Sequence, residues 1–224
     1  MGIIFTSVFL IPIALIIFFR LFNFRSYLAL GIYYLLIFFD ALIMQHFIDA
    51  GETFRKYYGV THDLLRVPLL LLFFTYFSPH PLVTKRMLYT GLAFIAYEML
   101  IISIIGYNKD ALTLIIGPGL LIILFFSSWF FIRLIKVTIN NKKAIGKAII
   151  LSSFLFVIGC YGIIYIMHFI LRTPETTDVY IMYLISSSVS AVVLSVGLII
   201  ENKRIQKLKE LLVTRQELRM IYKK

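Results

Sequence analysis

Long apolar runs separated by short polar stretches divide this chain of 224 residues. A helix that crosses a membrane needs roughly 17–25 mostly apolar residues, because each residue adds about 1.5 Å and the hydrocarbon core is about 30 Å thick. The runs that meet this length cover residues 3–19, 27–48, 64–83, 88–106, 111–135, 148–171 and 179–200. The pattern therefore predicts an all-α integral membrane protein, with a seven-helix transmembrane domain over residues 1–200.

The third run is the weakest of the seven. Its apolar core, Val67–Phe77, is short, and a full span has to include Arg66 or His80 at its ends. Six spans are therefore the alternative count.

Composition supports a lipid environment. The chain is 61% hydrophobic and 15% charged, with a mean hydropathy of +0.94, whereas soluble domains are roughly 45–50% apolar and about 25% charged. The first run follows no basic segment and shows no small-residue cleavage site, so we do not expect it to be a signal peptide. The heavy use of Ile, Phe and Lys suggests a bacterial inner-membrane protein.

Charged residues between the runs predict the orientation. The connections after the first, third and fifth runs carry only basic charges, and short basic loops stay in the cytoplasm. These residues are Arg20, Arg25, Lys85, Arg86, Arg133, Lys136, Lys142, Lys143 and Lys147. The other connections mix both signs, and the first of these, at about 49–63, is expected to leave Asp63 and Arg66 beside the third span. The N-terminus is thus predicted outside and the C-terminus inside.

Residues 201–224 form a separate basic segment with eight basic and three acidic side chains. Ile205, Leu208, Leu211 and Leu212 fall on one helical stripe, which predicts a cytoplasmic amphipathic helix. It could lie on the inner leaflet, pair with a second copy or a cytoplasmic partner, or simply extend the seventh span. The net charge of +11 is explained by such loops beside anionic lipid, so the lipid bilayer is the expected partner and nucleic acid is not.

Two acidic residues are predicted near the middle of the membrane. Counting from the cytoplasmic ends of their spans, Asp40 lies about 18–20 Å deep and Glu98 about 15 Å deep. Ionised groups at this depth are costly and mark candidate functional sites. The expected partners are tyrosines: Tyr97, Tyr161, Tyr165 and Tyr183. The group predicts a polar cavity for a small ligand, a cation or a proton, or else neutral acids that hold helices together.

A second polar group lies near the predicted outer edge. Gln45 and Asp49 share a helical face, and His46 is three residues from Asp49. With His168 on the sixth run, His46 and Asp49 could form a zinc site with an open position. An ordinary interfacial hydrogen-bond network is the default interpretation.

The sequence "GPG" at 117–119 predicts a kink in the fifth span, because proline frees a backbone carbonyl. Ser187, Ala191 and Ser195 recur every four residues on the seventh run and predict a small-residue packing face.

Known seven-span families fail on their motifs. The seventh run has no lysine, so no retinal Schiff base can form there, and receptor-type Asp-Arg-Tyr and NPxxY motifs do not occur. The HxxxH of membrane zinc hydrolases does not occur either. In topology alone, the chain resembles the membrane-embedded sensor regions that precede cytoplasmic helices in bacterial signalling proteins.

These observations favour a receptor or sensor-like membrane protein that signals through its C-terminal helix. The alternatives are an oligomeric ion or proton channel or transporter using Asp40 and Glu98, a membrane enzyme with an outer metal site, and an assembly subunit of a membrane complex. An enzyme is the less favoured class, because no dense catalytic signature occurs. No cofactor is expected unless zinc binds at the outer group.

Overall fold

The computed structural model describes residues 2–78, 80–141, 144–171 and 176–221. This part of the chain is helical throughout and contains no strand. Its elements are α1 (Gly2–Val8), α2 (Leu10–Phe18), η1 (Leu21–Asn23), α3 (Arg25–Met44), α4 (Glu52–Phe74), η2 (Thr75–Phe77), α5 (Pro81–Ile105), α6 (Lys109–Asn141), α7 (Ile145–Tyr165), η3 (Ile166–Ile170) and α8 (Thr176–Ile221).

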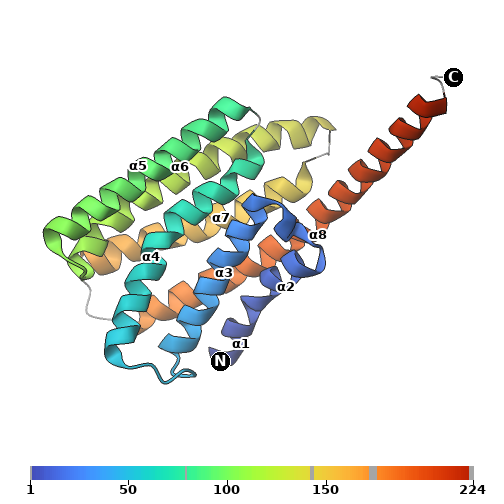
Figure 1. Cartoon of the computed structure of the whole chain (residues 1–224). Helices are drawn as coiled ribbons and strands as arrows, with labels where there is room; N and C mark the ends of the chain where they lie inside the picture. Colours follow the sequence, from blue (N-terminus) through green and yellow to red (C-terminus); the bar gives the residue numbers. More distant parts are fainter. Residues whose placement is uncertain (1, 79, 142–143, 172–175, 222–224) are drawn as a thin grey trace.

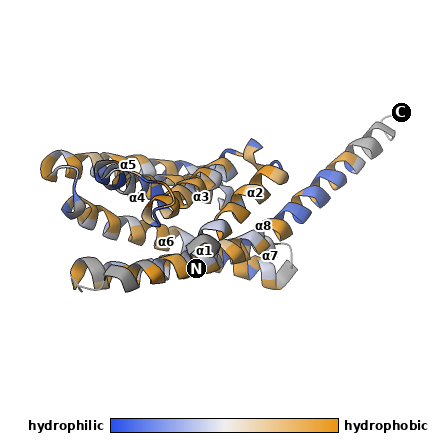
Figure 2. Ribbon diagram, turned by 90° about the horizontal axis from the view of Figure 1, so that it is seen from below, coloured by the Kyte–Doolittle hydropathy of each residue, from blue (hydrophilic) through white to orange (hydrophobic). Residues whose placement is uncertain are grey.

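Six helical segments in the described residues are long and apolar enough to cross a membrane. Their outward faces carry large apolar side chains, such as Leu121, Phe125 and Ile104, which are 68%, 65% and 72% exposed. Figure 2 shows apolar colour along most of the bundle, and hydrophilic colour at some helix ends and loops and along the part of α8 that projects from the bundle. Such a surface suits lipid, so the expectation of an all-α integral membrane protein is confirmed at this level.

The predicted count of seven spans is not confirmed, and the short segment is not the one that the sequence suggested. The third run belongs to a 26-residue helical segment, Glu52–Phe77, whereas the first run contains only a shorter apolar helix over Phe5–Phe18. α1 and α2 pack against α3 and α8, and Figure 1 shows them running alongside these helices from one end of the bundle toward the other.

The helices pack mainly as neighbours in the chain, with α8 closing the bundle. α3 lies on α4, α4 contacts α5 and α6, and α6 contacts α7. α7 packs along α8 so closely that a Cβ on Gly146 would lie 2.7 Å from the backbone nitrogen of Glu201. Apolar side chains from α2, α3, α4, α6, α7 and α8 meet in one core.

The basic connections gather at one end of the bundle. The Ser26 and Thr75 hydroxyls lie 2.9 Å apart, and Lys147 lies 4.2 Å from the centre of the Tyr76 ring. The η1 turn also faces α8 around Asn202 and Lys209. The residues that follow α2, α4 and α6 therefore lie at the same end of the bundle as the basic part of α8. The charge pattern along the sequence predicted this grouping.

The basic segment is continuous with the last span. α8 is a single helix of 46 residues, and Figure 1 shows its C-terminal part projecting from the bundle. As far as Ile221, the basic segment is therefore a direct extension of the seventh run.

Candidate functional site

A charged pair lies within α4, one turn before its proline. Asp63 and Arg66 are three residues apart, so they share a helical face, and the Arg66 Nη2 donates to Asp63 Oδ1 at 2.8 Å. The neighbouring His62 is 3% exposed, and its Nδ1 lies 3.7 Å from the same Asp63 oxygen. Asp63 and Arg66 were expected beside the third span. They belong to the helix itself, because mutual neutralisation lets α4 continue through them to Glu52.

Asp40 on α3 is the third charged member of this group. It is partly buried, and both the Asp63 carboxylate and the Arg66 guanidinium act electrostatically on it. No basic side chain was expected at the depth of Asp40. Arg66 nevertheless lies close enough to act on it electrostatically. The group holds two acids and one base, and Arg66 pairs directly with Asp63.

Aromatic and hydroxyl groups from α7 and α8 complete the cluster. The Arg66 guanidinium lies 4.9 Å from the centre of the Tyr161 ring, a cation–π arrangement that is strengthened away from water. The Tyr161 and Tyr183 rings stack with centroids 5.1 Å apart, and the Tyr161 and Ser187 hydroxyl oxygens are 2.7 Å apart. We call Asp40, Asp63, Arg66, Tyr161, Tyr183 and Ser187 the polar cluster. It joins α3, α4, α7 and α8.

The cavity beside Asp63 and Arg66 is small. It has a volume of about 10 Å³ and is otherwise lined by apolar residues of α4 and α6. A single water needs at least that much room. This cavity is therefore too small for a small-molecule ligand, and the cluster beside it offers electrostatics and hydrogen bonds.

Glu98 is 5% exposed on α5, which packs on α4 and α6. Within the described residues, no hydrogen bond reaches its Oε1 atom. The polar cavity that the sequence predicted around Asp40 and Glu98 stays a prediction.

Tyr97 and Tyr165 serve the predicted kink in α6. Pro118 has no N–H, so the Leu114 carbonyl four residues earlier loses its helical donor. The Tyr97 hydroxyl donates to that carbonyl at 3.0 Å, and the Tyr165 hydroxyl donates to Thr113 O at 2.8 Å. These two tyrosines, predicted as partners of the central acids, each donate to a backbone carbonyl of α6 just before Pro118.

Among the polar residues predicted near the outer edge, His46 has a clear role in ending helix α3. His46 has φ +59°, its N–H donates to Ile43 O, and the Phe47 N–H donates to Leu42 O. This is the Schellman helix end, with His46 at the left-handed position. Gln45 is partly buried, and Asp49 is exposed. The His168 side chain lies outside the described residues, and the described ones contain no cluster of three metal-binding side chains.

A second charged group, which sequence reasoning missed, lies at the basic end of the bundle. Glu201 is 0% exposed and accepts from the Tyr76 hydroxyl and from Arg204, whose Nη2 lies 2.6 Å from Oε1. The Lys147 ammonium lies over the Tyr76 ring. We call Tyr76, Lys147, Glu201 and Arg204 the inner cluster. The i,i+3 spacing of Glu201 and Arg204 is the sign of this pair in the sequence. Only the fold brings Tyr76 of η2 and Lys147 of α7 next to it.

Comparison with protein-family profiles, curated proteins and solved structures gave no match to this chain.

Proposed function

We propose that this protein is a sensor-like membrane protein in which the polar cluster sets the position of α8, and α8 carries that position to the basic end. One observation carries the proposal: a single helix holds Tyr183 and Ser187 in the polar cluster, Glu201 and Arg204 in the inner cluster, and then leaves the bundle. From Ser187 to Arg204 the helix rises about 25 Å.

In this proposal α8 transmits motion because it packs tightly against α7. A Cβ on Gly197 would lie 2.7 Å from Ile150 Cγ1, and one on Gly146 would meet the α8 backbone. Close packing makes such an interface switch between arrangements rather than deform gradually. A shift of α8 at one cluster therefore has to be accommodated at the other.

The small size of the cavity beside Asp63 and Arg66 favours the membrane as the stimulus over an enclosed small molecule. Two larger cavities lie elsewhere: about 600 Å³ between α6 and α7, and about 350 Å³ between η1 and α8. The transport alternative, with Asp40 and Glu98 as ion or proton sites, stays a prediction. In this proposal the extension of α8 is cytoplasmic and meets a partner or a second copy there.

The first test changes the polar cluster and reads the projecting helix. Spin labels at Lys85→Cys on α5 and Leu211→Cys on α8, in a Cys160→Ser background, report the distance between α8 and the bundle in lipid nanodiscs. Arg66→Gln leaves Asp63 without its partner cation, and breaking a buried ion pair costs about 3–5 kcal/mol. We expect the distance distribution to shift or broaden.

Arg86→Gln removes the same charge from an exposed arginine and should leave the distribution unchanged. Ser187→Ala is a milder change that deletes only the hydroxyl contact between α7 and α8. It keeps the test valid if Arg66→Gln fails to fold. An unchanged distribution in a folded cluster variant contradicts the proposal.

A further inference from the structure

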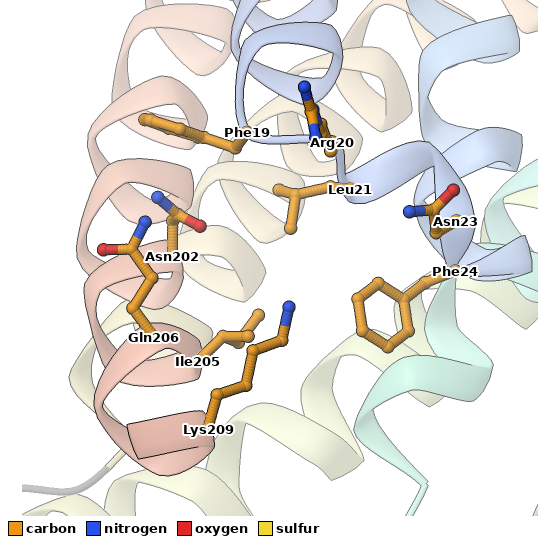
Figure 3. A pocket seen from close by; sticks show the side chains of 9 residues that line it. All are labelled: Phe19, Arg20, Leu21, Asn23, Phe24, Asn202, Ile205, Gln206 and Lys209. Carbon is orange, nitrogen blue, oxygen red and sulfur yellow. The ribbon is translucent and has the colours of Figure 1, made fainter. Parts of the chain in front are cut away.

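A cavity of about 350 Å³ opens at the basic end, between the η1 turn and the start of the α8 extension. Ligand sites are typically of this size or larger. Figure 3 shows α8 side chains along one wall and the turn between α2 and α3 along the other, with the Lys209 ammonium pointing into the space between them. Neither the polar cluster nor the inner cluster contributes a residue to its walls.

The polar part of the lining selects for negative charge. It consists of two basic side chains and three neutral amides: Arg20, Lys209, Asn23, Asn202 and Gln206. No acidic residue lines the cavity. The nearby Glu201 accepts from Arg204 and Tyr76, so its charge is already compensated. Of these groups, the Lys209 ammonium points into the space (Figure 3), and cationic and amide N–H groups are the donors that bind phosphate oxygens.

The remaining lining is apolar. Phe19, Leu21, Phe24 and Ile205 line the same cavity. Beside it, Phe18 is 80% exposed, on the face expected to meet lipid. A free phosphate would gain nothing from these side chains, whereas an amphiphile carries a phosphate and acyl chains together.

We infer that this cavity binds the phosphate-bearing headgroup of an anionic phospholipid, with the acyl chains leaving along Phe18 and Phe19. Anionic lipids concentrate in the cytoplasmic leaflet and attract basic segments there. The lipid would bridge the η1 turn and α8, and so hold the extension against the bundle. This consequence for α8 rests on the proposed function, whereas the binding site itself does not.

The test uses native mass spectrometry of the full chain in mixed micelles of phosphatidylcholine and phosphatidylglycerol. The measured quantity is the ratio of bound phosphatidylglycerol to bound phosphatidylcholine. At about 1 kcal/mol for each basic residue, Arg20→Gln with Lys209→Gln should lower this ratio at least about fivefold. Lys203→Gln with Lys207→Gln removes the same charge from the same region of the chain without touching the lining, and should change the ratio less than about twofold.

Lys209→Gln alone serves if the double variant is unstable. An equal fall in the control, or no fall in the pocket variants, overturns the site, because the attraction would then be diffuse. Displacement of the lipid by millimolar glycerol 3-phosphate also overturns it and assigns the cavity to a soluble phosphate ester.

The same spin-label pair separates this inference from the proposed function. With the site intact, nanodiscs containing phosphatidylglycerol should give a narrower distribution than pure phosphatidylcholine. Selective lipid binding without that change would leave the site standing and refute its role in moving α8.

Discussion

Two charged pairs inside the bundle each join residues one helical turn apart. Asp63 with Arg66 and Glu201 with Arg204 use the same i,i+3 spacing, which pairs opposite charges before any tertiary contact forms. An unpaired charge at this depth would cost several kcal/mol. Local pairing therefore explains why α4 and α8 continue through charged residues at which a hydropathy profile alone would have placed the end of a span.

At the residue scale, His46→Gly tests whether this histidine ends α3 or holds a metal. A non-glycine residue in the left-handed conformation costs roughly 1–2 kcal/mol. The variant should therefore unfold at the same temperature as the parent, or about 2 °C higher, in a detergent thermal melt. The 3.2 Å contact of His46 with Arg55 is exposed and adds little.

His80→Gly is the matched control, since His80 has φ −137° and gains nothing from glycine. A lower melting temperature for His46→Gly, accompanied by loss of bound zinc in elemental analysis, would restore the metal interpretation.

Elements are joined by glycines at close approaches and by tyrosines at breaks. Gly119 lets α6 approach α4 and α5, because a Cβ there would lie 2.7 Å from Val67 Cγ2 and 3.0 Å from Phe94 Cζ. The neighbouring Pro118 costs a backbone hydrogen bond, and Tyr97 replaces the lost donor. The "GPG" motif thus combines a kink with a packing contact.

At the element scale, Gly119→Ala should destabilise the bundle by about 1–3 kcal/mol through overpacking. Gly159→Ala is the control, since a Cβ at that α7 position meets nothing within 4 Å. It should be neutral or stabilise by up to about 1 kcal/mol. The two variants are compared by thermal unfolding in detergent, and equal effects would show that α6 does not pack as described.

In the whole molecule, the charge pattern and the helix packing distinguish the same two ends of the bundle. The ends of α2, α4 and α6 meet the basic part of α8, whereas the opposite end holds Arg55 beside His46 and Thr61 beside Tyr107. Basic ends face the cytoplasm in membrane proteins. This places the extension of α8 on the cytoplasmic side in the proposed function.

At this scale, single cysteines in a Cys160→Ser background test the orientation. A membrane-impermeant maleimide should label Thr53→Cys in intact cells, and should label Lys85→Cys and Lys207→Cys only after permeabilisation. The opposite pattern would refute the orientation. An N-terminal epitope tag reports the first run separately: we expect it outside, and its detection only inside would mean that α1 and α2 do not cross.

The sequence by itself determined the helical membrane class and the grouping of the basic connections, because each depends on hydropathy or charge that acts locally. It could not determine which polar residues meet. Depth along a span grouped Asp40 with Glu98, whereas the packing of α3 on α4 places Asp40 within electrostatic reach of Asp63 and Arg66. The inner cluster and the cavity between η1 and α8 likewise join residues more than 100 positions apart. Which residues come into contact depends on which helices are neighbours and on how each helix is rotated about its axis. Both follow from side-chain packing across the whole bundle rather than from any single run.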